Sequence, residues 1–177
     1  MGLYHFWPSI ETLSEAAHLV RPLIRSGGDK EKIMQSLNVE EEAIIAMLMM
    51  RATAIGEKNV KDALSFDTDD TVEFSLAPPL VFQGKDAAGL QAWFDTWDGP
   101  IGGDVQDAKL TIGADVAFWT GLVNMTGTKT DGTTVDLWFR QTLGLVKREG
   151  RWLVAHQHAS VPFAMDGSGK AMLDLRP

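Results

Sequence analysis

Two closely spaced histidines are the first candidates for chemistry in this chain. The chain has four histidines, and His156 and His158 stand two apart in the segment WLVAHQHASVPF (152–163). An imidazole titrates near neutral pH, so it can serve as a general acid or base. Three interpretations are open: a hydrogen-bonding or acid/base pair in a pocket, two ligands of a metal ion, or polar residues satisfied within a sheet. Because a metal site needs a third ligand and no residue is marked as one, we predict no metal and no cofactor.

Arg140 is the second candidate, inside the segment VDLWFRQT (135–142). A buried arginine needs an anion, because an unpaired charge is very costly to bury. The anion would come either from a protein carboxylate, with Asp136, Glu73 and the acids at 67–70 as candidates, or from a ligand carboxylate. We predict a catalytic group made of His156, His158 and Arg140.

The elements that position these residues are long strands, in which side chains alternate between two faces. On residues 151–161, His156, His158 and Ser160 share a face with Trp152, and on 133–147 Arg140 shares a face with Trp138. A lining that mixes apolar and polar groups suits a small-molecule pocket, although a polar row at a solvent-exposed dimer edge would alternate in the same way. We predict that one cavity is bordered by His156, Arg140, Ser75 and at least one tryptophan. The opposite faces are mainly aliphatic, and we predict that they form a homodimer interface through Leu137, Phe139, Leu143, Leu145, Leu153 and Val161.

The order of elements predicts an α+β fold. Helical periodicity dominates the first third, with Asp29 and Asn38 as expected caps of two successive helices, and Asp86 caps a later helix that ends before Gly99-Pro100. Alternating strands follow at 71–76, 104–112, 115–127, 133–147 and 151–161, joined by turns that contain Gly113, Gly132 and Gly150. A curved antiparallel sheet wrapped around N-terminal helices makes a cone whose concave side is a natural pocket.

Composition excludes several classes of partner. The chain has 177 residues, enough for one domain, and a formal net charge of −8 that would repel nucleic acid. The longest apolar run, AIIAMLMM (43–50), is too short to span a membrane, and we expect that the first residues do not act as a signal peptide. Cysteine is absent, which fits a reducing compartment, and we expect a cytoplasmic protein.

Five segments in order carry a resemblance to a known family: DDTVEFSLAPPLVFQGKDA (69–87), WFDTWDGPI (93–101), DVAFWTGL (115–122), VDLWFRQT (135–142) and GRWLVAHQHASVPF (150–163). The chain resembles the SnoaL-like and ketosteroid isomerase-like branch of the nuclear transport factor 2-like superfamily. The resemblance implies a cystatin-like α+β cone with a pocket between sheet and helices, usually in a homodimer packed through the sheets. It does not imply one reaction, because the same cone carries isomerases, dehydratases, cyclases and binding modules.

One position departs from the enzymes of that superfamily. The resemblance implies an aspartate base five residues after the Asp69-Asp70 pair, and this chain has Ser75 there. A serine hydroxyl cannot replace a carboxylate base, and Glu73 on the same strand face is roughly 6.6 Å away along the strand. The predicted binding residues are Ser75, Glu73, Trp138, Trp119, Trp93, Thr120 and Ser160.

Two functional hypotheses follow. The first is a cofactor-independent isomerase, cyclase or dehydratase that acts by general acid/base chemistry on a hydrophobic, oxygenated small molecule, which could be a carboxylate. The second is a non-catalytic ligand-binding or dimer-assembly module. Ser75 favours the second hypothesis and the paired histidines favour the first, so whether the chain is an enzyme stays open.

The chain divides into a helical N-terminal extension at 1–37, a SnoaL-like domain at 38–165 and a tail at 166–177. The extension lies outside the resemblance but carries apolar stripes, which would be unfavourable in water. We predict that it folds over the domain or its dimer mate and restricts access to the pocket; simple stabilising packing on the surface is the alternative.

Overall fold

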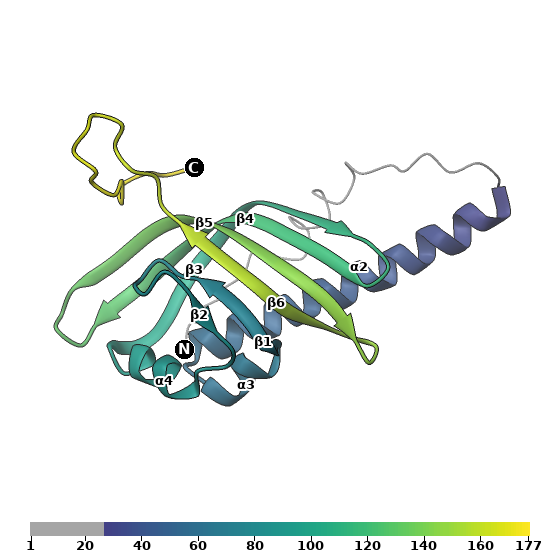
Figure 1. The fold of residues 1–177 in the computed structure, drawn as a ribbon, viewed down its shortest axis with the longest axis horizontal. Coiled ribbons are helices and arrows are strands. Elements are labelled where there is room, and N and C mark those ends of the chain that lie inside the picture. Colours follow the sequence, from purple (N-terminus) through teal and green to yellow (C-terminus); the bar gives the residue numbers. More distant parts are fainter. Residues whose placement is uncertain (1–26) are drawn as a thin grey trace, which may run out of the picture.

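The computed structural model describes residues 27–177, with side chains from Val39 onward. Its elements follow one another as an early group of helices and a later meander of long strands (Figure 1). Their bounds are α2 Gly27–Gly56, α3 Val60–Ser65, β1 Asp67–Phe74, β2 Phe82–Gln83, α4 Ala87–Phe94, β3 Trp97–Ile112, β4 Val116–Lys129, β5 Thr134–Arg148 and β6 Arg151–Ser160. This arrangement confirms the predicted α+β class.

Helix α2 is one continuous helix of 30 residues. The two successive helices predicted from capping signals at Asp29 and Asn38 are therefore wrong, since both residues lie inside α2. Capping residues are only mildly unfavourable within a helix, so helix-forming residues on both sides can override them. The predicted division at residues 37 and 38 falls within this helix. Residues 1–26 of the predicted extension, and with them most of the proposed lid, lie outside the described residues.

The strands form one curved, unclosed sheet in the order β2-β1-β6-β5-β4-β3. Every neighbouring pair is antiparallel except β1 and β6, which run parallel and pair Glu73 with Gln157. The predicted curved antiparallel sheet is confirmed, and one parallel pair lies within it. The parallel pair brings the first strand, next to the helices, against the last strand of the chain.

Local turn and capping signals are confirmed. Gly132 and Gly150 take positive φ angles of 85° and 76° in the β4–β5 and β5–β6 turns, a conformation that glycine adopts without strain. Asp86 caps α4 by accepting a hydrogen bond from the backbone N–H of Gly89 at 2.8 Å. Helix α4 ends at Phe94 and β3 begins at Trp97, so β3 starts earlier than predicted.

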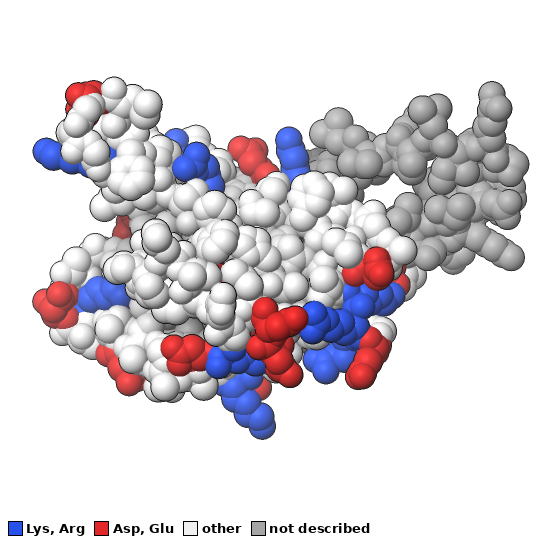
Figure 2. Space-filling view, viewed as in Figure 1, with Lys and Arg blue, Asp and Glu red and all other residues white. Residues whose placement is uncertain are grey.

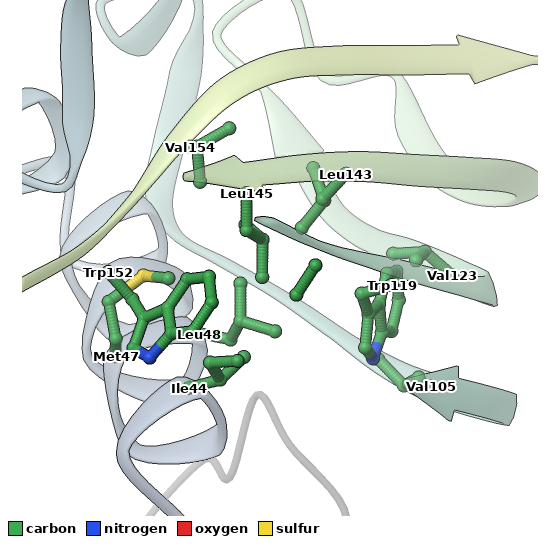
Figure 3. Packing of buried hydrophobic residues seen from close by; sticks show 11 residues of the cluster. Ile44, Met47, Leu48, Val105, Trp119, Val123, Leu143, Leu145, Trp152 and Val154 are labelled. Carbon is green, nitrogen blue, oxygen red and sulfur yellow. The ribbon is translucent and has the colours of Figure 1, made fainter. Parts of the chain in front are cut away.

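The main core lies between α2 and the inner face of the sheet (Figure 3). Ile44 of α2, Leu145 of β5 and Val154 of β6 are each 0% exposed. A polar contact fixes the same helix to the sheet: Glu40 accepts hydrogen bonds from the Lys147 ammonium at 2.5 Å and the Trp152 indole N–H at 2.6 Å. A second cluster of Phe94, Trp97 and Ile101 packs α4 against β3. Among the helices of residues 27–177, none is long and apolar enough to cross a membrane.

Candidate functional site

A cavity of about 400 Å³ lies between the helices and the inner face of the sheet. Its walls come from α2, α3, α4 and all six strands. Most of the lining is aliphatic or aromatic, including Leu48, Ile55, Leu90, Trp93, Val105, Val123, Phe139 and Leu143. Such a lining suits a small hydrophobic molecule.

A chain of polar side chains crosses this apolar lining. The Arg51 Nε donates a hydrogen bond to Asp67 Oδ1 at 2.9 Å, and its Nη2 donates to Gln157 Oε1 at 3.1 Å. Gln157 Nε2 in turn donates to Glu73 Oε1 at 3.0 Å. Ser75 also forms a hydrogen bond with the carboxyl group of Glu73. All five residues line the cavity, so the polar chain ends at a carboxyl group beside the empty space.

Four of the five members, all except Ser75, lie in helices or strands. Arg51 lies near the end of α2, with Leu48 and Ala52 beside it on the core side. Glu73 and Gln157 are register partners on the parallel strands β1 and β6, so the backbone itself sets their side chains next to each other. The Arg51 and Asp67 side chains are 13% and 8% exposed, so this ion pair is nearly buried.

Glu73 is in an environment that favours its neutral form. Burial in the apolar wall raises the pKa of Glu73 above its usual value, as does the Asp67 charge to a smaller degree. The positive charge of Arg51 and the hydrogen bonds from Ser75 and Gln157 oppose this shift without cancelling it. A carboxyl group with a raised pKa at the edge of a cavity is a candidate general acid or base.

Three of the predicted binding residues lie where the sequence placed them. Glu73, Ser75 and Trp93 all line the cavity. Glu73 comes from the inward side of β1, and Ser75 follows directly after the end of that strand. Trp93 comes from α4, where its ring packs against Phe94 and Trp97.

The other predicted site residues lie elsewhere. Trp119 is 3% exposed and belongs to the core cluster without lining the cavity. The remaining six lie on the outer face of the sheet, opposite the cavity-lining neighbours Phe139, Gln141 and Ala159; they are His156, His158, Arg140, Ser160, Thr120 and Trp138. The prediction that His156, Arg140 and Ser75 border one cavity is therefore wrong.

On the outer face the two histidines surround an aromatic ring. Phe74 meets the rings of His156 and His158 edge-on, at centroid distances of 5.0 and 5.6 Å. His156 Nδ1 is also 2.9 Å from the Val72 carbonyl oxygen. Arg140 is exposed and, among the described residues, forms no ion pair with a carboxylate.

Alternation was read correctly on β5, but the wrong face was assigned to the pocket. The aliphatic face proposed as a dimer interface is the covered one, since Phe139 and Leu143 line the cavity and Leu145 lies in the core. The remaining members, Leu137, Leu153 and Val161, are half-buried. Helix α2 covers the aliphatic face because burying apolar side chains is more favourable than burying the mixed polar side chains of the opposite face.

Sequence reasoning missed Arg51 and Gln157, and it considered Asp67 only among the acids that could pair with Arg140, whereas Asp67 pairs with Arg51. Arg51 directly follows the apolar run AIIAMLMM (43–50), and Gln157 stands between two more conspicuous histidines. The signal available in the sequence was an arginine directly after an apolar helical run. Such a run is expected to be buried, and a charged side chain buried with it must be paired. Across residues 27–177, no group of three or more His, Asp or Glu side chains is arranged to hold a metal ion.

Comparison with known proteins gives a consistent picture. The family model of the SnoaL-like domain matches residues 44–164. An NTF2-like protein of unknown function from Pseudomonas putida is 25% identical with a TM-score of 0.71, over 79% of this chain and 98% of that one. No curated protein matches the chain significantly.

Two further structures share the fold at lower identity. A candidate scytalone dehydratase from Novosphingobium aromaticivorans has a TM-score of 0.66 at 16% identity, covering 78% of this chain and 94% of that chain. A candidate calcium/calmodulin-dependent protein kinase II association domain from Xanthomonas campestris has a TM-score of 0.59 at 20% identity, covering 70% and 86%. Both likenesses concern the fold alone.

Proposed function

The chain belongs to the SnoaL-like domain family, and from this premise we propose that its cavity binds a small hydrophobic molecule and that Glu73 moves a proton on it. The observation that carries the proposal is the polar chain ending at Glu73 within an otherwise apolar wall. The reaction would be a cofactor-independent isomerisation, dehydration or cyclisation.

The charges around the cavity favour an uncharged ligand. In the part of the chain that the structure describes, the cavity is lined by one basic residue, Arg51, whose charge is offset by Asp67 in a nearly buried ion pair. The other ionisable groups in the described lining, Glu73 and Asp86, are acidic. Among the side chains described from Val39 onward, a ligand carboxylate would find no free cation in the lining, since Arg140 lies outside. A ketone or alcohol on an apolar skeleton fits the wall better than an acid does.

The environment of Glu73 suits proton transfer to and from carbon or oxygen. As a carboxylate it would take a proton from a carbon next to a carbonyl group, forming an enolate, and in an isomerisation it would return that proton to another carbon. In a dehydration the carboxylic acid formed by that step would protonate a hydroxyl group on the next carbon, which departs as water while the electron pair of the enolate forms the C=C bond. Burial raises the pKa of Glu73 and strengthens it as a base in the first step, and it also lets the acid form persist closer to neutral pH for the second.

The test is hydrogen exchange on a model ketone. We would incubate 2-tetralone, an uncharged bicyclic ketone, with the protein in D₂O and follow loss of the α-proton signals by NMR. Wild type should accelerate exchange, and Glu73→Gln should reduce the acceleration on the order of 10²–10⁴-fold, the usual contribution of a general base. Glu57→Gln, at an exposed position after α2, is the matched control.

Binding is measured separately, so that catalysis and occupancy are not confused. Ala159→Phe places a ring in the cavity wall and should abolish tetralone binding seen by ligand-observed NMR. If wild type bound uncharged ketones but exchanged none of them faster than Glu73→Gln does, the non-catalytic binding module would be the better description.

We also propose a homodimer formed through the outer face of the sheet. Phe74, Phe118 and Val116 are 40%, 49% and 57% exposed on strands β1 and β4. In the view of Figure 1, β5 and β6 lie in front of α2. The middle of the surface seen from this side carries few charged side chains (Figure 2). Exposed aromatic residues in such a patch are typical of a contact surface. Sedimentation should give a dimer at micromolar concentration, and Phe118→Glu should shift it toward monomer; a monomeric wild type would contradict the proposal.

A cytoplasmic location is the compartment that fits the composition. The chain contains no cysteine, so its fold contains no disulfide bond that a reducing environment would break. Fractionation of cells that express the natural gene would test this location.

A further inference from the structure

The side chain of Gln157 bridges a cation and a carboxyl group. Its Oε1 is 3.1 Å from Arg51 Nη2, and its Nε2 is 3.0 Å from Glu73 Oε1. Gln157 comes from β6 and Glu73 from β1, while Arg51 comes from α2. Three elements therefore meet in one hydrogen-bonded chain at the cavity wall.

The chemistry of the donors fixes the direction of this chain. A guanidinium group has five N–H donors and no acceptor, so the Gln157 atom that faces Arg51 must be the amide oxygen. The amide NH₂ then faces Glu73 and can only donate. The hydrogen bond to Asp67 at 2.9 Å holds the Arg51 side chain in place. While Arg51 is held there, the Gln157 amide cannot rotate to exchange its oxygen and NH₂ positions without losing its bond to Arg51.

We propose that Arg51, acting through Gln157, is a positioning residue that makes Oε2 of Glu73, and not Oε1, the atom that gives and takes the proton. This inference rests on the proposed role of Glu73 as the acid or base of the cavity. It assigns the proton to one oxygen of that carboxyl group.

The assignment follows from the acceptor role of Oε1. An oxygen that carries the acidic proton is a poorer acceptor than a carbonyl oxygen, so protonation at Oε1 would weaken the bond from Gln157. Protonation at Oε2 keeps that bond and leaves Oε1 as the carbonyl oxygen. Ser75 does not decide between the two, because a hydroxyl group donates to a carboxylate and accepts from an acid equally well.

The groups that face Glu73 come from each neighbouring element: Arg51 from α2, Asp67 from β1, Ser75 from the segment just after β1, and Gln157 from β6. The Arg51 charge and the Gln157 donor both lower the pKa of Glu73 against the larger raising effect of burial. Loss of the Gln157 donor should therefore raise the pKa further and remove the bond to the carbonyl oxygen.

The test reads the carboxyl group directly and needs no substrate. Infrared difference spectra of the full chain, recorded across pH and referenced to Glu73→Gln, isolate the C=O band of protonated Glu73. In Gln157→Leu this band should move to higher frequency, because its carbonyl oxygen loses a donor, and the titration midpoint should move to higher pH. Gln141→Leu, the same substitution at another glutamine of the cavity wall, should move neither.

Arginine variants test the action at a distance. Arg51→Met frees the amide to turn over, so the C=O band should split or broaden, whereas Arg51→Lys keeps a cationic donor and should restore a single band in part. Gln157→Met serves as a second deletion of the donor if Gln157→Leu does not fold, with circular dichroism as the check. If a folded Gln157 variant matched Gln141→Leu in band position and midpoint, the positioning role would be overturned. The exchange test of the proposed function could still succeed or fail independently, because it measures turnover and not the carboxyl band.

Discussion

Gly144 on β5 faces His156 on β6 so closely that a Cβ on Gly144 would lie 3.2 Å from the Cβ of His156. The next residue of β5, Leu145, pairs with Val154 and not with Ala155. Ala155 is therefore an extra residue, a β-bulge in the last strand. Before the bulge, even-numbered residues such as Val154 face the core.

After the bulge the inward positions become odd-numbered. Gln157 and Ala159 line the cavity, while His156 and His158 face outward. If the alternation of faces is continued through Ala155 without a bulge, His156 and His158 are placed on the same face as Val154. That is the inner face, and it is the wrong face for the two histidines. This single residue accounts for the misplaced histidine pair on β6.

The bulge makes a specific prediction about deletions. Deleting Ala155 should leave a regular strand in which Val154 and Gln157 still face inward, so the protein should fold with a loss of about 1–3 kcal/mol. Deleting Thr142, which lies in regular pairing on β5, should turn half of that strand to the wrong face and prevent folding. Urea unfolding with a structural check by circular dichroism distinguishes them. Equal damage by both deletions would mean that the extra residue is not a removable bulge.

Local signals predicted much of the fold. The Asp86 cap, the glycine turns at 132 and 150 and the four long strands depend on residues near one another in the sequence, and they were found from it. The order of the strand segments, together with these turns, also led to the correct family. Such features are specified by residues within a few positions, which is why one sequence suffices for them.

The candidate site depended on relationships that a single sequence does not display. Arg51 and Gln157 are 106 positions apart, and the choice of the covered sheet face is made by α2 and not by the strands themselves. Ala155 has none of the glycine or proline signals that usually mark a bulge. Glu73 and Ser75 were identified because they lie at and just beyond the end of one strand, where residues two apart face the same side and local reasoning holds.

The Arg51–Asp67 pair should be costly to break from one side. Arg51→Met leaves the Asp67 carboxylate nearly buried without its cation, and we expect a loss of roughly 3–5 kcal/mol in the free energy of unfolding. The double variant Arg51→Met/Asp67→Leu should lose much less than the sum of the two single changes, since neither charge remains. Denaturant unfolding of all four proteins in the cycle measures the coupling.

An exposed pair provides the control for that cycle. Lys85 and Asp69 form an ion pair at 2.8 Å, but the Asp69 side chain is 95% exposed. Lys85→Met should change the free energy of unfolding by about 0–1 kcal/mol, as solvent screens such pairs. Additive effects at Arg51 and Asp67 would indicate that the two side chains do not depend on each other for burial.

Glu40 should stabilise the protein at neutral pH and lose that effect in acid. Its hydrogen bond from Lys147, and next that from Trp152, hold the pKa of Glu40 below its usual value. A lowered pKa means that the stabilisation is present above the usual carboxyl pKa and disappears as the pH falls through the folded-state value. Glu40→Gln should therefore lower Tm at neutral pH and have little effect in acid. Glu42→Gln, exposed on the same helix, should lower it at neither pH.

Glu73 should have the opposite pH dependence. Burial raises the pKa of Glu73 in the folded protein, so the folded state holds the proton more tightly than the unfolded chain does. The favourable effect of the neutral carboxyl group is complete below the unfolded pKa and is lost as the pH rises through the folded pKa.

Glu73→Gln keeps a neutral side chain at every pH. The free energy of unfolding of this variant should therefore increase relative to that of wild type as the pH rises from about 4 to about 8. Urea unfolding across this range measures the difference, with Glu57→Gln as an exposed control that should show no such gain. A constant difference between Glu73→Gln and wild type would mean that Glu73 titrates alike in both states, and the candidate acid/base group would lose its physical basis.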